Sequence, residues 1–141
     1  MATTRNATTH WEGSLMEGEG RVTLESSGLG TFDVNWPSRA ETPNGRTSPE
    51  ELIAAAHSSC FSMALSHGLA QAGTPPTSLD TSAAVTFQPG EGITGIVISV
   101  VGVVPDIDEA ACIAAAEGAT ANCPVSTALA GTTITLEARL G

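Results

Sequence analysis

The feature that most constrains the fold is a helix start and a helix stop with a long stretch between them. Ser48-Pro49-Glu50-Glu51 combines a capping serine, a proline at the first helical position and a glutamate that completes a capping box. Gly73 and the pair Pro75-Pro76 end the segment. We therefore expect one long helix from residue 49 to about residue 71 or 72.

The segments on either side of this helix are typical of short strands and shorter helices. Because the strands on each side follow one another through turns, they predict an α+β fold with mostly antiparallel sheet, in a single domain of residues 1–141. The long helix is rich in alanine and serine and has apolar residues on more than one side, so one copy of the chain would hardly cover it and a dimer is expected. The expected strands are 8–15, 20–26, 30–36, 79–88, 92–104 and 132–140, with a loop PSRAETPNGRT before the long helix, a helix from Asp106 or Asp108 to about Thr120, and a short helix starting at Cys123-Pro124.

Composition excludes several classes of protein. The formal net charge is −10, and the chain has arginines but no lysine and no basic run, which argues against nucleic acid or an anionic membrane as partner. The longest apolar stretch, Ile96 to Val104, is of strand length, and the N-terminal residues lack the apolar run of a signal peptide. We expect a cytoplasmic protein with reduced cysteines, because an odd number of three cysteines fits a disulfide framework poorly.

Cys60 lies within the long helix, in AAAHSSCFSMALSHGL. Free cysteine is often buried as a small hydrophobic group, which is the favoured interpretation on helix geometry alone. A metal site with His57 and His67 is disfavoured, because His67 would lie about 10 Å further along the helix axis than Cys60. The third possibility is a reactive thiol.

The other two cysteines differ from each other. Cys123 precedes Pro124 and is expected at the cap of the short helix, where free N–H groups favour a thiolate. Cys112 lies on an alanine-rich helix without a nearby cation and is interpreted as structural. Cys60 and Cys123 would form a redox couple if the fold brought them together, which spacing alone does not establish.

Two motifs resemble a known family. SPEELIAAAHSSCFSMALS together with NCPVSTAL is similar to the two cysteine signatures of the OsmC/Ohr family, the osmotically inducible and organic hydroperoxide resistance proteins, and closer to the OsmC branch. The resemblance covers nearly the whole chain. It implies an intertwined homodimer in which mostly antiparallel sheets wrap around a long central helix.

The resemblance also implies a thiol-dependent peroxidase that reduces organic hydroperoxides better than hydrogen peroxide. Cys60 matches the peroxidatic cysteine, Cys123 the resolving cysteine that forms a disulfide with it, Arg39 the catalytic arginine and Glu50 its partner carboxylate. No cofactor and no metal are expected, and the reductant is a dithiol, often lipoyl in this family. Candidate residues for an apolar pocket beside Cys60 are Phe61, Met63 and Trp36.

Helix geometry constrains how these residues can share a site. Cys60 lies beyond the reach of the helix dipole and needs a cation to lower its pKa, for which Arg39 is the best candidate. Ten residues of helix place Glu50 about 15 Å from Cys60. If Arg39 and Glu50 act on Cys60, either the helix breaks or the glutamate comes from a partner chain whose helix runs antiparallel. We expect the second arrangement, a composite site at a two-fold interface.

Two alternatives use the same residues differently. A general thiol–disulfide oxidoreductase would need the same cysteines, but the chain lacks a Cys-x-x-Cys motif. A non-catalytic binding member of the fold is the second alternative, against which the joint presence of both cysteines, Arg39 and Glu50 counts.

Overall fold

The computed structural model describes all residues from Met1 to Gly141. The chain forms two compact units, Met1–Leu52 and Ile53–Gly141, and the long helix α2 (Pro49–Gln71) begins in the first and continues through the second. None of the helices is both long enough and apolar enough to cross a membrane. The α+β architecture predicted from the sequence is confirmed, while a single domain for residues 1–141 stays a prediction.

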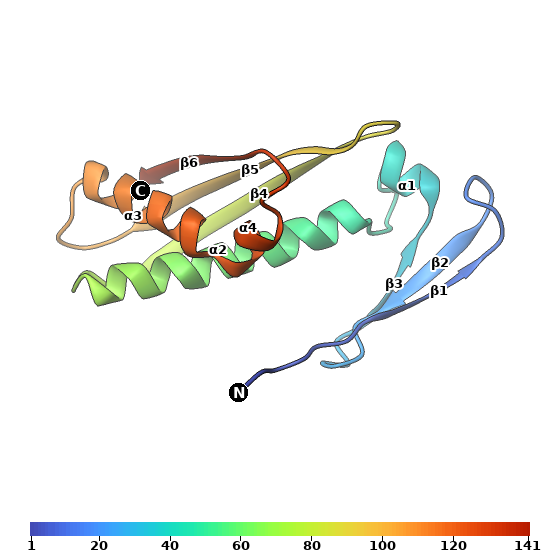
Figure 1. Cartoon of the computed structure of the whole chain (residues 1–141), viewed down its shortest axis with the longest axis horizontal. Helices are drawn as coiled ribbons and strands as arrows, with labels where there is room; N and C mark the ends of the chain where they lie inside the picture. The colour runs from blue at the N-terminus through green and yellow to red at the C-terminus, as the bar shows by residue number, and fades with distance from the viewer. The chain divides into compact units, whose positions relative to one another are not determined.

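The first unit is a small antiparallel sheet followed by a short helix (Figure 1). The strands β1 (Thr8–Glu12), β2 (Glu19–Thr23) and β3 (Thr31–Val34) pair in chain order, with Val22 opposite both Thr9 and Phe32. The helix α1 (Trp36–Ala40) follows β3 directly. Val22 is the one large hydrophobic side chain of this unit that is buried, so the sheet has little core of its own.

The second unit packs helices against one face of a second three-stranded sheet (Figure 1). The strands β4 (Ser78–Gln88) and β5 (Gly92–Val103) form an antiparallel hairpin, and β6 (Ile134–Leu140) pairs with β5 in parallel. Between β5 and β6 the chain forms α3 (Glu109–Asn122) and α4 (Pro124–Ala128).

The core of the second unit follows from two sequence periodicities. On α2 the buried side chains recur every fourth residue, and on β5 every second residue, so each element presents one apolar face. These faces meet the inner face of α3. The buried core residues of this unit include Phe61, Leu65 and Leu69 of α2, Ile96, Ile98 and Val100 of β5, and Ala116, Ala119 and Cys123 at α3 and its end.

The predicted boundaries of the long helix are confirmed at both ends. The Ser48 Oγ accepts a hydrogen bond from the Glu51 backbone N–H at 3.1 Å, although the Glu51 carboxylate accepts from Thr47 Oγ1 and not from the cap. At the other end Gly73 has a φ of 86°, and the Thr74 N–H closes the helix on the carbonyl of Leu69.

The structure also corrects the segment predicted before the long helix, since the strand expected over 30–36 ends at Val34. The segment beginning PSRA was predicted as loop, but Trp36–Ala40 is the helix α1, capped by Asn35, whose Oδ1 accepts from the Ser38 N–H at 2.8 Å. The fixed φ of Pro37 suits the first turn of a helix, and the side chain of Asn35 satisfies a backbone donor that would otherwise be unpaired. Arg39 therefore lies on a helix and not in a loop.

Candidate functional site

The structure brings together the two cysteines that the sequence singled out. Cys60 on α2 and Cys123 at the junction of α3 and α4 are within hydrogen-bonding reach of each other, and all three cysteines of the chain are free thiols. Cys60 is half-buried, whereas Cys123 is fully buried. A small molecule entering from solvent therefore meets the sulfur of Cys60 first.

The position of Cys123 explains its chemistry. It ends α3 and caps α4, with Pro124 at the first helical position and no side chain capping the helix, so its sulfur faces the free N–H groups of the first turn. Burial raises the pKa of the Cys123 thiol. The hydrogen bond from Cys60 and those from the backbone and hydroxyl of Ser126 and the backbone of Val125 outweigh it, so the net pKa is lowered.

Cys60 has the opposite balance within the second unit. Burial and the hydrogen bond it shares with Cys123 raise the pKa of the Cys60 thiol, and one backbone hydrogen bond from Val125 acts against them. Because the two thiols share a hydrogen bond, the first proton is lost from the pair as a whole and not from one residue alone. The remaining S–H then donates to the thiolate beside it.

A buried histidine lies behind the thiol pair. His57 is fully buried on α2, and its Nε2 lies 2.7 Å from the Oγ of Ser126, which also faces Cys123. His57, considered from the sequence as a metal ligand and disfavoured as one, makes a buried hydrogen bond instead. Reasoning from sequence missed Ser126, because one serine inside NCPVSTAL carries no distinguishing signal. No group of three or more His, Cys, Asp and Glu side chains lies close enough together to hold a metal ion.

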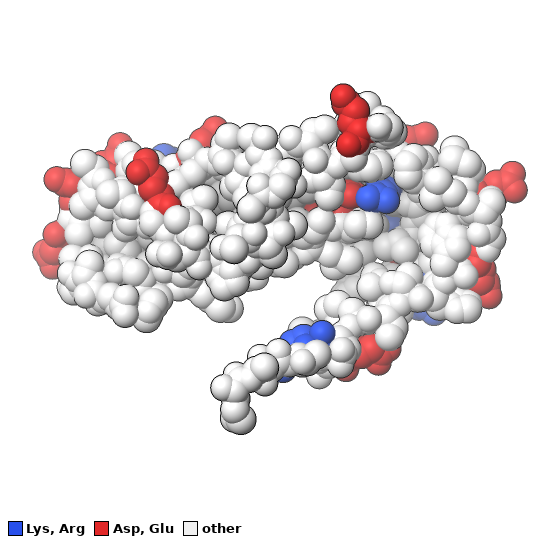
Figure 2. Space-filling model, in the orientation of Figure 1, with Lys and Arg blue, Asp and Glu red and all other residues white.

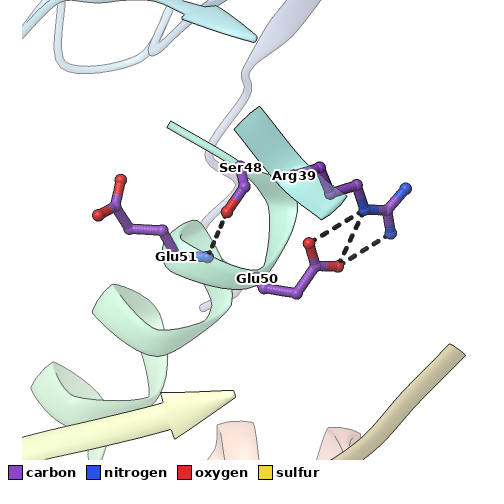
Figure 3. A network of polar contacts seen from close by, with 4 residues as sticks. All are labelled: Arg39, Ser48, Glu50 and Glu51. Carbon is purple, nitrogen blue, oxygen red and sulfur yellow. Dashed lines mark hydrogen bonds and ion pairs between the residues drawn. The ribbon is translucent and has the colours of Figure 1, made fainter. Parts of the chain in front are cut away.

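Arg39 and Glu50 form an ion pair within the first unit (Figure 3). The Arg39 Nε donates to both carboxylate oxygens of Glu50, at 3.0 and 3.2 Å, and Nη2 donates to Oε2 at 2.9 Å. The Glu50 side chain is only 8% exposed while that of Arg39 is 32% exposed. A buried carboxylate that binds two guanidinium nitrogens fixes the plane of that guanidinium.

The same arginine contributes to the wall of an apolar pocket. The pocket lies in the first unit and has a volume of about 270 Å³. Of the candidate lining residues, Trp36 belongs to this pocket, whereas Phe61 is buried in the core of the second unit and Met63 is exposed on α2. The remaining apolar walls come from Trp11, Leu15, Val22, Val34 and Leu52.

Charge is distributed without a basic patch on the face shown in Figure 2, where acidic side chains are scattered singly. The chain holds fifteen acidic residues against five arginines. One of the five, Arg39, is held by Glu50, and Arg21 pairs with Asp33 at the surface.

Comparison with known proteins identifies the family. The sequence pattern of the family described as "OsmC-like protein" matches residues 42–137, and the chain is 44% identical over 123 residues to the peroxiredoxin OsmC of Escherichia coli, covering 85% of each chain. The chain belongs to the OsmC-like family. An equally similar relative is the peroxiredoxin OsmC of Shigella flexneri. Both relatives are named as peroxiredoxins, and this protein is likewise a cysteine-based peroxidase.

Solved structures agree with the fold of an OsmC-like protein. An organic hydroperoxide resistance protein from Elizabethkingia anophelis superposes with a TM-score of 0.77 and covers 100% of this chain and 99% of its own, at 23% identity. A protein described as organic hydroperoxide resistance protein OsmC from Legionella pneumophila gives a TM-score of 0.76 at 23% identity, covering 99% of this chain and 98% of that one. At this identity the likeness concerns the fold alone.

Proposed function

We propose that this OsmC-like protein reduces organic hydroperoxides to alcohols, with Cys60 as the peroxidatic and Cys123 as the resolving cysteine. The observation that carries the proposal is the pair of free thiols in mutual contact, one half-buried and one fully buried. Contact allows a disulfide to form without unfolding. The difference in exposure assigns the two roles, because only the more accessible sulfur can meet a substrate.

The proposed reaction has three balanced steps. The Cys60 thiolate attacks the terminal oxygen of the hydroperoxide; the O–O bond breaks, and the alkoxide takes up a proton and leaves as the alcohol. Cys60 is then a sulfenic acid, and the Cys123 sulfur attacks the Cys60 sulfur and releases water. An external dithiol reduces the Cys60–Cys123 disulfide by two thiol–disulfide exchanges and is itself oxidised.

Ionisation of the pair is compatible with attack by Cys60. When the pair loses one proton, the negative charge is shared through the S–H···S contact, although the local hydrogen bonds favour the thiolate of Cys123 more than that of Cys60. A cation beside Cys60 would shift the charge toward that sulfur. Arg39 is our candidate for this cation.

We propose that Arg39 and Glu50 reach Cys60 from a second copy of the chain in a homodimer. Glu50 and Cys60 lie ten residues apart on the continuous helix α2, which corresponds to about 15 Å along its axis. Two features support a second copy: the first unit exposes Trp11 and Phe32, and α2 exposes Met63.

The pocket beside Arg39 supports an organic substrate. Its volume of about 270 Å³ and its largely apolar walls, including Trp11, Leu15 and Trp36, suit a hydrocarbon group. If Arg39 faces the thiol, the pocket that it lines is brought to the same place. Hydrogen peroxide would gain nothing from those walls, so it should be the poorer substrate.

The three free cysteines bear on the reductant and on the location of the protein. A dithiol such as a lipoyl group would regenerate the thiols, and a cytoplasmic location would keep the three free cysteines reduced. A general thiol–disulfide oxidoreductase is disfavoured, because such an enzyme needs its reactive cysteine open to protein substrates and Cys60 is half-buried.

The proposal is tested by counting free thiols before and after one equivalent of cumene hydroperoxide. We expect wild-type protein to lose two thiols per chain rapidly and to retain the buried Cys112 thiol. In Cys60→Ser the number of free thiols should not change. In Cys123→Ser a sulfenic acid should persist and become over-oxidised with excess peroxide. Thiol loss as slow as that of free cysteine would instead favour a non-catalytic member of the fold.

A further inference from the structure

The buried pair of His57 and Ser126 has no part in the three steps above. Both side chains are buried, with 0% and 6% of their surface exposed, and Nε2 and Oγ are 2.7 Å apart. Such a short polar contact behind a reactive sulfur is expensive to bury unless every group in it has a partner. The partners of each polar atom in this contact therefore indicate which atoms carry a hydrogen.

The hydrogen bonding of His57 selects one tautomer. Its Nδ1 is buried and has no hydrogen-bond partner, whereas Nε2 faces Ser126. A buried N–H without an acceptor is rarer and costlier than an unpaired lone pair, so the hydrogen belongs on Nε2. Burial lowers the pKa of His57, which keeps the ring neutral in this arrangement. His57 thus donates to the Ser126 oxygen.

Donation by His57 leaves the Ser126 hydroxyl with a hydrogen to give. Ser126 Oγ accepts from His57, and its own O–H faces the sulfur of Cys123, as does the Ser126 backbone N–H. The three side chains form a chain of donors that ends on a sulfur and not on solvent. A hydroxyl held in this direction stabilises a thiolate more than a thiol.

We propose that His57 is a positioning residue for disulfide formation: by donating to Ser126 it fixes the serine hydroxyl on Cys123, and this favours the Cys123 thiolate that closes the disulfide. The inference rests on the proposed function. In the closing step the Cys123 thiolate attacks the Cys60 sulfur, the S–S bond forms and the S–O bond breaks. The hydroxide released takes up the proton that Cys123 had given up, and it leaves as water.

The first test measures the Cys123 thiolate directly and needs no peroxide. In protein carrying Cys60→Ser and Cys112→Ala, Cys123 is the one thiol, and its ultraviolet absorbance is titrated against pH. We expect Ser126→Ala and His57→Leu each to raise the pKa of Cys123 by about one unit, a tenfold loss of thiolate below that pKa. His57→Gln, which keeps an N–H donor, should recover most of the shift.

A control variant tests whether the hydroxyl must point at the Cys123 sulfur. Thr127→Ala removes the neighbouring hydroxyl, which bonds the Cys123 carbonyl and not the sulfur, and should leave the titration unchanged. An unchanged Cys123 titration in Ser126→Ala, or a shift equally large in Thr127→Ala, would overturn the inference. Ser126→Ala carries the test on its own if His57→Leu does not fold.

The second test separates the two chemical steps by rapid mixing with cumene hydroperoxide. In Ser126→Ala and His57→Leu the oxidation of Cys60 should keep its rate, while disulfide closure slows at neutral pH. The slowing should be about threefold, less than the tenfold loss of thiolate, because the higher pKa makes each remaining thiolate more nucleophilic. Closure at the wild-type rate, or equal slowing of both steps, contradicts the positioning role. If wild-type protein forms no disulfide, the proposed function fails, and the thiolate titration still decides whether His57 fixes the Ser126 hydroxyl on Cys123.

Discussion

A thiol in the middle of a long helix lies outside the range of the helix dipole, so its reactivity depends on side chains that other elements supply. For Cys60 these are Cys123, in hydrogen-bond contact, and the proposed guanidinium of Arg39. Burial acts against ionisation at this position. The chemistry of the site is therefore a property of neighbours and not of the cysteine itself.

The planar guanidinium group of Arg39 should matter more for activity than its charge alone. Arg39→Lys keeps the charge but loses the planar group that binds both oxygens of Glu50. We expect kcat/KM for cumene hydroperoxide to fall at least about tenfold, about 1.4 kcal/mol of transition-state stabilisation, with little change in melting temperature. Arg21→Lys, at an exposed ion pair with Asp33, is the matched control and should keep full activity. Full activity of Arg39→Lys would remove the guanidinium from the mechanism.

Stability should depend on the protonation of His57. Burial lowers its pKa in the folded state below the ordinary value of 6.5, so the unfolded chain binds more protons below that pH. The free energy of unfolding is therefore unaffected above about pH 7.5 and falls as the pH drops through 6.5. Urea titrations at several pH values should show this slope in wild-type protein and lose it in His57→Gln. An equal slope in wild-type protein and His57→Gln would contradict this assignment.

At the scale of elements, the short helix α1 aims Arg39. A helix of five residues has few hydrogen bonds of its own, so its cap has a large share in its stability. Asn35 provides that cap, and the ion pair with Glu50 ties the helix to the first turn of α2.

Removing this cap should therefore affect catalysis as well as stability. Asn35→Ala is expected to cost about 1 kcal/mol in unfolding free energy and to lower kcat/KM several-fold. Asp108→Ala removes the equivalent cap of α3, whose Oδ1 accepts from the Ala111 N–H, and should cost similar stability without loss of kcat/KM. Chemical denaturation and steady-state peroxidase assays on both variants distinguish the two effects. Equal loss of kcat/KM in both would mean that stability alone is responsible.

The sequence was sufficient to predict the elements with strong local signals. The cap at Ser48, the stop at Gly73 and the cap expected at Asp106 or Asp108 predicted α2 and α3 to within a few residues. The helix Trp36–Ala40 was not predicted, because five residues are too few to show helical periodicity, although Asn35 followed by Pro37 is a capping signal. The parallel pairing of β5 with β6 and the contact of Cys60 with Cys123 depend on tertiary packing, which no local pattern encodes.

At the scale of the whole molecule, the first unit is poorly covered. It buries a single large hydrophobic side chain, Val22, and exposes Trp11, Leu15 and Phe32. A three-stranded sheet with so little core needs another surface against its apolar side chains. A second copy of the chain is the partner that we propose. The same arrangement would explain how Glu50 and Cys60 serve one site although they lie ten residues apart on one helix.

Mixed dimers test the composite site directly. Cys60→Ser and Arg39→Ala chains, each inactive alone, are unfolded together and refolded so that mixed dimers form. If Arg39 acts across the interface, one site of each mixed dimer is intact, and about a quarter of wild-type activity should return when half of the dimers are mixed. Refolded mixtures without activity would place Arg39 and Cys60 of one chain in the same site.

The unequal burial of the two sulfurs has a consequence for how the enzyme is regenerated. With Cys123 sealed inside the protein, an incoming dithiol can approach the oxidised bridge only from the side of Cys60. In the proposed mechanism the transient adduct with the reductant is therefore carried on α2, and Cys123 departs as the leaving group, for which its lowered pKa suits it. In that mechanism the fold determines which of the two sulfurs the reductant attacks.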